Sequence, residues 1–253
     1  MGHVSIGRPV IRVSETGSTM DLAAGLADRG ASSGTVVLAG HQTAGRGRAG
    51  REWRDEPWSS ILMSFLHVSS RPQSSLGLLA PAVGLAVAKA IEPWLAGAPS
   101  VKWPNDVLIG DRKIAGVLTS VRLRPDGCTR VICGIGLNVR NAPDTLPQTA
   151  TSLVIESGRE IDLQSVFDSL IEELSGIVTR FENGDDDRIA ADLTDRLAWR
   201  GQPVAVADAD RTHAGILDRI ARDGSLILVD DRDSPLRIVA GDLTRGPRPN
   251  AMP

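Results

Sequence analysis

The stretch between residues 100 and 139 restricts the possible fold most strongly, because it alternates strand-like runs with tight turns. Its halves, "SVKWPNDVLIGDRKIAGVLTSVRL" and "TRVICGIGLNV", flank "RPDG", and a "GD" pair divides the first half. Turns this short join antiparallel neighbours, whereas parallel strands need a long crossover connection. Helical patterns precede and follow these strands. We therefore expect an α+β domain built around a mixed or antiparallel sheet.

The helices are predicted from apolar spacing and from signals at their ends. "GSTMDLAAGLADRGA" should form a helix with Ser18 as the N-cap and Asp21 completing a capping box. "SSLGLLAPAVGLAVAKAIEPWLAG" should be a buried helix, with Pro81 as a candidate break. Two amphipathic helices are expected between residue 162 and about residue 200, separated by "ENGDDD". "GTVVLAGHQTAG" and "SSILMSFLHVS" are predicted strands that precede the central stretch.

The pattern changes after residue 200. The following segment contains about four short strand-like runs with turn signals such as "RDGS" and "DRDSP", and it lacks helical periodicity. This pattern is typical of a small β-barrel of about 45 residues. We therefore divide the chain into a larger domain at residues 1–200 and a small domain at residues 201–247.

The composition excludes several classes of protein. With 42% apolar residues, 23% charged residues and a net charge of −3, the chain is an ordinary globular protein without a general attraction to nucleic acid or membranes. Its longest apolar run, residues 76–88, falls short of the roughly 20 residues that span a bilayer, and the N-terminus lacks the apolar core of a signal peptide. We expect a cytoplasmic protein. Cys128 and Cys133 are too few for a disulfide framework or zinc site and should be reduced.

The first candidate binding segment is "GRGRAGREW", residues 45–53, which we call the arginine loop. Arg46, Arg48 and Arg51 stand among three glycines, and Trp53 follows. Guanidinium groups pair with carboxylate or phosphate oxygens, glycines let a ligand approach the backbone, and an indole can cover a flat ring. Taken alone, such a loop also fits a solvated loop or a nucleic-acid patch.

Three further clusters complete the pattern: "KWPND" at residues 102–106, "RKIAG" at 112–116 and "GIGLNV" at 134–139. Only three of the 28 basic residues are lysines, and two of these, Lys102 and Lys113, lie in these clusters. A compact ammonium is therefore indicated at both places. Together the four clusters call for an anionic ligand with a flat ring and polar edges, a description that ATP meets. There is no serine elbow, histidine metal pair or Walker loop.

The order "STMDLA", "HQTAGRGRAGREW", "KWPNDV", "DRKIAGVL" and "GIGLNV", followed by an all-β tail, strongly resembles the biotin protein ligases. The resemblance covers the chain from about Ser14. It implies a catalytic domain like those of class II aminoacyl-tRNA synthetases and biotin synthetases, with a C-terminal SH3-like barrel. It also implies two half-reactions, in which biotin and MgATP give biotinyl-5′-AMP and pyrophosphate, and the adenylate then acylates a lysine of a biotin carboxyl carrier protein domain, as in acyl-CoA carboxylases.

The resemblance also implies residue roles. The expected catalytic residues are Lys113, Arg48 and Arg51, with Lys113 contacting both the biotin carboxylate and the α-phosphate. Biotin would be bound by Ser18, Thr19, Gln42, Gly45, Arg46, Gly47, Lys113 and Gly116. ATP would be bound by Arg48, Arg51, Trp53, Asn105, Asp106 and Asn138. Asp242, Arg245 and Arg248 are candidates for a further nucleotide contact from the tail, and Mg²⁺ is expected to be held largely by phosphates and water.

Alternative functions remain open from the sequence. A lipoate–protein ligase shares the catalytic fold, and a non-enzymatic nucleotide-binding module would also use an arginine loop. Only 17 residues precede Ser18, too few for the winged helix-turn-helix of repressor members, so we expect no nucleic-acid partner. The protein is expected to be a monomer or homodimer. We also expect the arginine loop to be mobile when empty and to close over bound anions, because its three like charges and its glycines oppose order.

Overall fold

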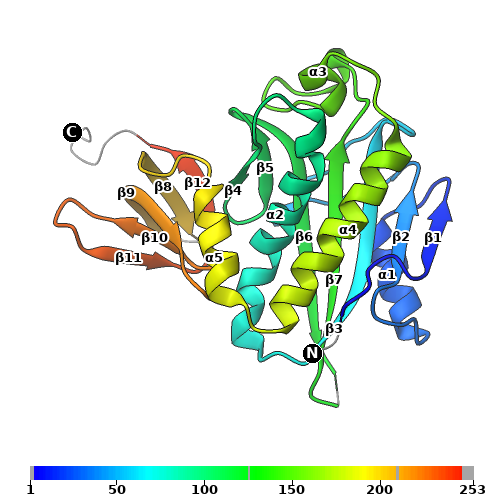
Figure 1. Ribbon diagram of the computed structural model, residues 1–253, viewed down its shortest axis with the longest axis horizontal. Coiled ribbons are helices and arrows are strands. Elements are labelled where there is room, and N and C mark those ends of the chain that lie inside the picture. The colour runs from blue at the N-terminus through cyan, green and yellow to red at the C-terminus, as the bar shows by residue number, and fades with distance from the viewer. Residues whose placement is uncertain (1–2, 125, 209–210, 247–253) are drawn as a thin grey trace.

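The computed structural model describes residues 3–124, 126–208 and 211–246, and it contains two sheets (Figure 1). The larger sheet has seven strands in the order β1-β2-β3-β7-β6-β5-β4. Only the β1–β2 pair is parallel, so the expected α+β fold with a mixed sheet is confirmed. The strands are β1 (Val10–Val13), β2 (Val36–Ala39), β3 (Ser60–Ser69), β4 (Ser100–Lys102), β5 (Asp106–Ile109), β6 (Arg112–Leu123) and β7 (Thr129–Asn138).

The predicted hairpins form the centre of this sheet. β6 and β7 pair from Ala115–Leu137 to Leu123–Thr129. β5 and β6 are joined by a turn in which Gly110 has φ +59°, a left-handed conformation that favours glycine. The "KWPND" segment connects β4 to β5. Asp106 pairs with Gly116, and Gly116 with Gly136, so the "KWPND", "RKIAG" and "GIGLNV" clusters lie side by side across β5, β6 and β7.

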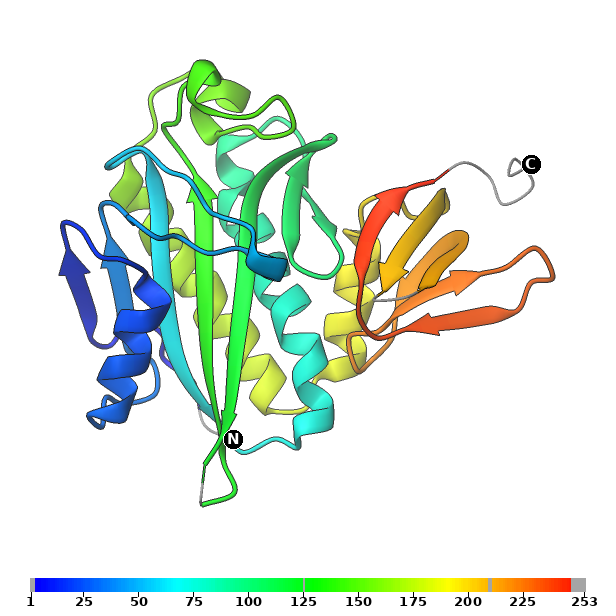
Figure 2. The ribbon, with the colours of Figure 1, turned by 180° about the vertical axis from the view of Figure 1, so that it is seen from behind.

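Helices cover both faces of the sheet. On one face, α2 (Leu79–Ile91) packs against β6 and against α4 (Leu163–Glu182) and α5 (Asp186–Asp195). On the opposite face, α1 (Thr19–Asp28) packs on β2, β3 and β7, and the arginine loop crosses the same face (Figure 2). A short helix, α3 (Leu153–Ser157), follows the main sheet strands and was not predicted. The two amphipathic helices expected after residue 162 are confirmed as α4 and α5.

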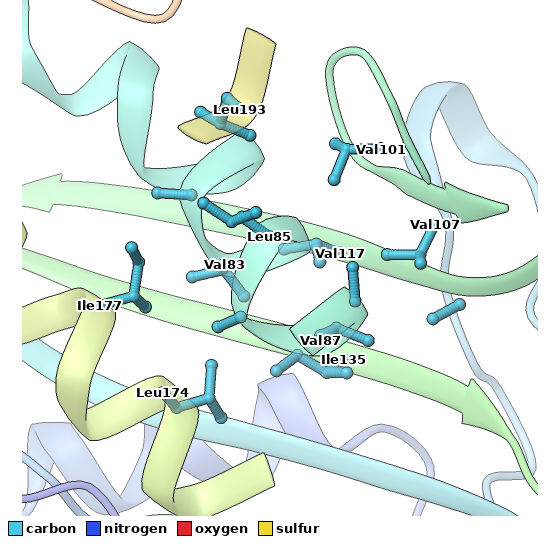
Figure 3. Packing of buried hydrophobic residues seen from close by; sticks show 14 of the residues in the cluster. Val83, Leu85, Val87, Val101, Val107, Val117, Ile135, Leu174, Ile177 and Leu193 are labelled. Carbon is cyan, nitrogen blue, oxygen red and sulfur yellow. The ribbon is translucent and has the colours of Figure 1, made fainter. Parts of the chain in front are cut away.

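The core lies between the sheet and α2, which is buried on nearly every side because α4 and α5 cover it (Figure 3). With its flanking 3₁₀ turns this helical segment runs over residues 73–94, longer than the apolar run suggested, and is long and apolar enough by length and composition to cross a membrane. It is mostly buried inside the protein, as expected of a core helix. The core side chains include Val83, Leu85 and Val87 of α2, Val117 and Ile135 of the sheet, and Leu174 and Ile177 of α4.

Two local predictions about helix ends are wrong. Ser18 occupies the N-cap position of α1, but its side chain accepts no capping hydrogen bond. Asp21 does not complete a capping box and instead pairs with Arg46 of the arginine loop. Pro81 does not interrupt α2; it lies in the first turn, where a helix needs no backbone N–H from this residue.

The second sheet contains five antiparallel strands in the order β11-β10-β9-β8-β12, one more than the sequence suggested. It contacts the larger sheet through the "KWPND" turn, where buried Trp103 donates its indole N–H to the carbonyl of Gly224 at 2.9 Å. Both ribbon views place β12 beside β4. The strands are β8 (Pro203–Asp208), β9 (Arg211–Ile220), β10 (Leu226–Val229), β11 (Pro235–Ile238) and β12 (Asp242–Arg245).

Candidate active site

A cleft of ≈ 260 Å³ lies where α1, the arginine loop, the β4–β6 hairpins and β12 meet. Segments that are far apart in the sequence contribute its walls. The ribbon seen from behind shows the arginine loop lying between α1 and β12 (Figure 2). Most of the residues predicted for the site line this cleft. They are Ser18, Thr19, Gln42, Arg46, Gly47, Arg48, Arg51, Trp53, Asn105, Asp106, Lys113 and Gly116.

One end of the cleft is polar and buried. The backbone N–H of Thr19 donates to Oε1 of Gln42 at 2.8 Å, and the Thr19 hydroxyl donates to the same oxygen at 3.0 Å. The Thr19 hydroxyl also lies 2.8 Å from Oγ of Ser64, a β3 residue that the sequence did not single out. Since Gln42 Oε1 is occupied, its amide nitrogen is the group available to a ligand. Ser18 is 3% exposed and lines the cleft without a side-chain bond to any described residue.

The arginine loop is folded as a small hairpin. Arg46 and Glu52 form an antiparallel bridge, Gly47 N–H donates to the Arg51 carbonyl at 2.7 Å, and Trp53 N–H donates to the Gly45 carbonyl at 2.9 Å. The tip contains Ala49 and Gly50 in left-handed conformations. The sequence predicts that Gly45 contacts biotin, but Gly45 does not line the cleft. The tight backbone of the hairpin explains why this position is a glycine. A Cβ there would lie 2.5 Å from the Trp53 carbonyl oxygen, so the position serves the hairpin.

Acidic groups of the protein itself neutralise the arginines of this loop. Arg46 pairs with Asp21. Arg51 contacts both carboxylate oxygens of Asp242, at 3.0 and 3.2 Å, and Arg48 lies 3.4 Å from the same carboxylate. Asp242 belongs to β12, so the second sheet supplies the counter-charge. These guanidinium groups are partly exposed and can exchange carboxylate partners for another anion.

Trp53 lies flat against the sheet at two glycines. A Cβ at Gly136 would be 2.5 Å from Cε2 of Trp53, and one at Gly116 would be 3.3 Å from Cζ3. The predicted close approach at the "GIGLNV" glycines is therefore present, and Gly134 receives Met20 in the same way at 2.9 Å. The indole Nε1 of Trp53 is buried and has no hydrogen-bond partner among the described residues.

Lys113 lies at the centre of the cleft. Its Nζ is 2.6 Å from Oδ1 of Asp106 and 5.7 Å from the centroid of the Trp53 ring. The carboxylate contact is a close ion pair. The neighbouring Asn105 accepts from Arg48 at 3.0 Å and donates to the Val117 carbonyl at 3.0 Å. Asn105 thereby holds Arg48 against the sheet.

The sequence predicts that Asn138 contacts ATP, but Asn138 does not line the cleft. It is 4% exposed, and its amide nitrogen donates to the carbonyl of Thr151 at 3.0 Å, which ties the end of β7 to the segment before α3. Its Oδ1 is buried without a partner among the described residues. The alternation of side chains along a strand predicts which face of the sheet Asn138 occupies, but it does not predict how far along that face the cleft extends. The prediction for Asn138 therefore differs from its observed position.

The second sheet and Lys102 add charges at the far end of the cleft. Asp242 lines it together with Leu243 and Thr244, whereas Arg245 turns away and pairs with Asp111 at 2.8 Å. Arg248 lies outside the described residues. Lys102 lines the cleft, and burial lowers the pKa of its ammonium, with a smaller contribution in the same direction from Lys113.

The described residues that line the cleft include no histidine or cysteine. Among the residues that the structure describes, no group of three or more His, Cys, Asp or Glu side chains gathers to hold a metal. His41 pairs with Asp55 at 2.9 Å and His67 with Glu182 at 2.8 Å, both away from the cleft lining. Cys128 and Cys133 are free thiols, as expected, and burial raises the pKa of Cys133 far above its ordinary value.

Comparison with known proteins agrees with this arrangement. The model of the Biotin/lipoate A/B protein ligase family matches residues 12–138. The biotin--[acetyl-CoA-carboxylase] ligase of Mycobacterium tuberculosis is 37% identical over 199 residues, which are 77% of this chain and 73% of that protein. The chain belongs to the biotin/lipoate A/B protein ligase family. The residues that the family model matches include the arginine loop, "KWPND", "RKIAG" and all of "GIGLNV" except Val139.

Other members of the family show the extent of the likeness. The bifunctional ligase/repressor BirA of Bacillus subtilis is 35% identical over 170 residues, and the chain spans about half of that protein's length, 52%. The biotin protein ligase of Aquifex aeolicus, solved in complex with biotin and ATP, superposes with a TM-score of 0.80 at 27% identity. That alignment covers 94% of this chain and 100% of the other, so it includes both sheets.

Proposed function

We propose that this protein uses ATP to convert biotin to biotinyl-5′-AMP and then transfers the biotinyl group to a lysine of a biotin carboxyl carrier protein domain. The observation that carries this proposal is that a single cleft joins the buried Thr19–Gln42 end to a cationic end around Lys113. A neutral polar ring and a polyphosphate can therefore lie side by side. Relatives and solved neighbours in the family are biotin ligases, which supports biotin as the acid.

The buried end suits the ureido group of biotin. This group presents one carbonyl and two N–H groups, and it needs fixed donors and acceptors inside an otherwise apolar slot. The Gln42 amide nitrogen and the Ser18 hydroxyl supply them, while Thr19 holds Gln42 in place. The biotin tail is assigned to the region of Gly116, a glycine that gives Lys113 and Trp53 room to lie close to the sheet, because a Cβ there would lie 3.0 Å from Nζ of Lys113 and 3.3 Å from Cζ3 of Trp53.

The cationic end suits adenylation. The biotin carboxylate oxygen attacks the α-phosphorus, the bond to the β-phosphate oxygen breaks, and pyrophosphate leaves with the electron pair. Lys113 would stabilise charge on the attacking carboxylate and the α-phosphoryl oxygens, and Arg48 and Arg51 the charge on the phosphate chain. Arg46 and Gly47 would cover the biotin side. Each cation then exchanges an internal carboxylate for a substrate oxygen.

The nucleotide base is assigned to the region of Trp53. The indole offers a flat surface beside the sheet glycines, and its buried N–H has no partner among the described residues. Asn105 and Asp106 lie next to Arg48 and Lys113 and are assigned to the phosphates. A role for Asn138 requires the Trp53 ring to move, and the buried Oδ1 of Asn138 without a partner among the described residues would then accept a hydrogen bond from the base amine.

Mg²⁺ would enter with ATP. Asp106 lines the cleft, with Oδ1 2.6 Å from Nζ of Lys113. Its carboxylate is a hard oxygen donor of the type that Mg²⁺ and its bound waters prefer. Because no protein cage gathers among the described residues, most of the coordination is assigned to phosphates and water. The ion would neutralise charge on the departing pyrophosphate.

The second half-reaction needs a carrier domain. A lysine amine attacks the carbonyl of the mixed anhydride, AMP leaves, and an amide forms. A carrier domain of an acyl-CoA carboxylase is the proposed acceptor, in agreement with the relatives' names, which specify acetyl-CoA carboxylase. A cytoplasmic location, a monomer or homodimer, and the absence of a nucleic-acid partner belong to the same proposal.

Mass spectrometry of the purified protein incubated with MgATP and biotin, and with lipoate in a parallel reaction, tests the proposal. We expect biotinyl-AMP and pyrophosphate without an acceptor, and a mass increase of a biotin carboxyl carrier domain when it is added. Lipoyl-AMP alone would assign the protein to the lipoate branch of the family. The absence of either adenylate would leave a nucleotide-binding module.

A further inference from the structure

Among the described residues, each cation that lines the cleft except Lys102 has a carboxylate oxygen within 4.0 Å. Lys113 pairs with Asp106, Arg48 and Arg51 pair with Asp242, and Arg46 pairs with Asp21. Within the described part of the chain, no carboxylate oxygen lies within 4.0 Å of Nζ of Lys102. Lys102 is therefore a half-buried ammonium that lines the cleft without a direct ion pair to any described carboxylate, although Asp106 and Asp242 act on it from a longer distance.

An aromatic ring holds this ammonium instead of a carboxylate. Nζ of Lys102 lies 5.3 Å from the centroid of the Trp199 ring, and Cζ of Arg245 lies 5.7 Å from that centroid. The face of an indole attracts a cation without neutralising it. Trp199 thus fixes the direction of the Lys102 side chain and leaves its charge available.

Trp199 is itself fixed by both parts of the molecule. It lies between α5 and β8, on the connection between the sheets, and has φ +64°, a conformation that is unusual for a bulky residue. Its indole N–H donates to Oδ1 of Asp111 at 2.9 Å, and Arg245 donates to Oδ2 of the same carboxylate at 2.8 Å. Asp111 belongs to the turn between β5 and β6, which carry Asp106 and Lys113. The contact thus joins the second sheet to the strands that form the reaction centre.

We infer that Lys102 binds the phosphate chain of ATP and the pyrophosphate that leaves, and that Trp199, held by Asp111 and Arg245, is a positioning residue for Lys102. This inference rests on the proposed function. Burial lowers the pKa of Lys102, and Lys113 and Arg51 act in the same direction, whereas Asp106 and Asp242 raise it without reversing the shift. An anion bound next to the ammonium would offset this cost. Through Arg245, Asp111 and Trp199, the second sheet thereby sets the position of the Lys102 ammonium in the cleft.

Calorimetric binding of inorganic pyrophosphate, MgATP and biotin to single and double variants tests this inference. Lys102→Met should weaken pyrophosphate binding by about tenfold, the loss of one charge-assisted contact, and leave biotin binding within about twofold. Lys102→Arg should recover part of the affinity. Lys89→Met is the matched control, because Lys89 pairs with Asp192 on the helical side and does not line the cleft.

The role of Trp199 is tested by a double-mutant cycle. Trp199→Ala should weaken pyrophosphate binding by about threefold to fivefold, Trp199→Phe should restore it because a ring face remains, and Trp199→Ala should have no further effect in the Lys102→Met background. Asp111→Asn, which keeps an acceptor for the indole, should be milder than Asp111→Ala. Equal effects of Trp199→Ala on biotin and pyrophosphate, or full additivity with Lys102→Met, would overturn the positioning role.

The outcomes separate this inference from the proposed function, because pyrophosphate binding needs no turnover. A protein that forms no biotinyl-AMP but follows the binding cycle contradicts the proposed function and supports the inference. A protein that forms biotinyl-AMP while Lys102→Met binds pyrophosphate normally contradicts the inference alone.

Discussion

The two ends of the cleft are built in different ways. At the polar end, Ser18 and Thr19 are each 3% exposed, and hydrogen bonds tie Thr19, the first residue of α1, to Gln42 and to Ser64 of β3. At the cationic end, the side chains of Arg46 and Arg51 are 52% and 62% exposed and are neutralised by acidic groups from other elements. The first end is held by hydrogen bonds within the protein, whereas the second end is held by exposed ion pairs whose carboxylates we expect ligand oxygens to replace. The polar end, which is held rigidly, and the cationic end, which can change its ion-pair partners, are thus separate parts of one site.

The largest effect is expected from Lys113, where the two ends meet. Lys113→Ala should lower the rate of biotinyl-AMP formation by about 10³-fold, because it removes a positioned charge from the reacting oxygens and leaves the Asp106 carboxylate without its ion-pair partner. Single-turnover measurement of adenylate formation checks this value, with Lys89→Ala as the control. A loss below about tenfold would assign the electrophilic role to the arginines.

Gln42→Ala tests the rigidity of the polar end. We expect biotin affinity to fall by about 10- to 100-fold, because the substitution removes a ligand contact and leaves the buried N–H of Thr19 without an acceptor. Calorimetry with biotin and, separately, with MgATP measures the difference, and MgATP affinity should stay within about twofold. Gln164→Ala, at an exposed position on α4, controls for general loss of stability. Equal weakening of both ligands would show that the two ends are not independent.

Asp242→Asn tests whether the cationic end is adaptable. Exposed ion pairs contribute about 0–1 kcal/mol, so releasing Arg48 and Arg51 should strengthen MgATP binding by no more than about fivefold. Hydrogen exchange should become faster in residues 45–53 and stay unchanged in α1. The same experiment with biotin and MgATP present tests closure of the arginine loop, since the bound state should restore protection. Weaker MgATP binding would mean that Asp242 contacts the nucleotide or its ion directly.

The smallest effect concerns stability and pH at the cationic end. Burial lowers the folded-state pKa of Lys102 below its ordinary value of 10.5, so the ammonium destabilises the folded state at all pH values below the folded pKa. This cost disappears as pH rises from the folded pKa to the unfolded value. Lys102→Met should therefore raise the Tm at pH 7, and the gain should shrink as pH approaches 10.5.

Thermal unfolding at several pH values measures this difference. Lys89→Met, which removes a surface pair with Asp192, is the control and should give no gain. A constant gain across the pH range would instead reflect added apolar burial by the methionine. The result would show whether the charge of the cationic end is kept at a cost to stability, as expected of a residue retained for binding.

Local structure was predictable where one short segment contains the whole signal. The β6–β7 hairpin, the buried α2 helix and the pair α4–α5 follow from apolar period and turn residues. The capping box is absent, and Asp21 pairs instead with Arg46, which lies 25 residues away in the chain and which local sequence signals do not bring near. Four-residue β1 and five-residue α3 were missed, since such short elements owe their form to neighbours rather than to their own period.

The candidate site divides in the same way. Sequence alone determined which residue types assemble, because guanidinium, ammonium, glycine and amide groups at these spacings permit few ligands other than a nucleotide with an acid. Only the tertiary structure decided that Gly45 and Asn138 leave the cleft, that Ser64, Met20 and Asp242 enter its surroundings, and that Trp199 faces Lys102. The physical reason is range: backbone preferences act over a few residues, whereas ion pairs and ring contacts join groups that only the completed fold brings together.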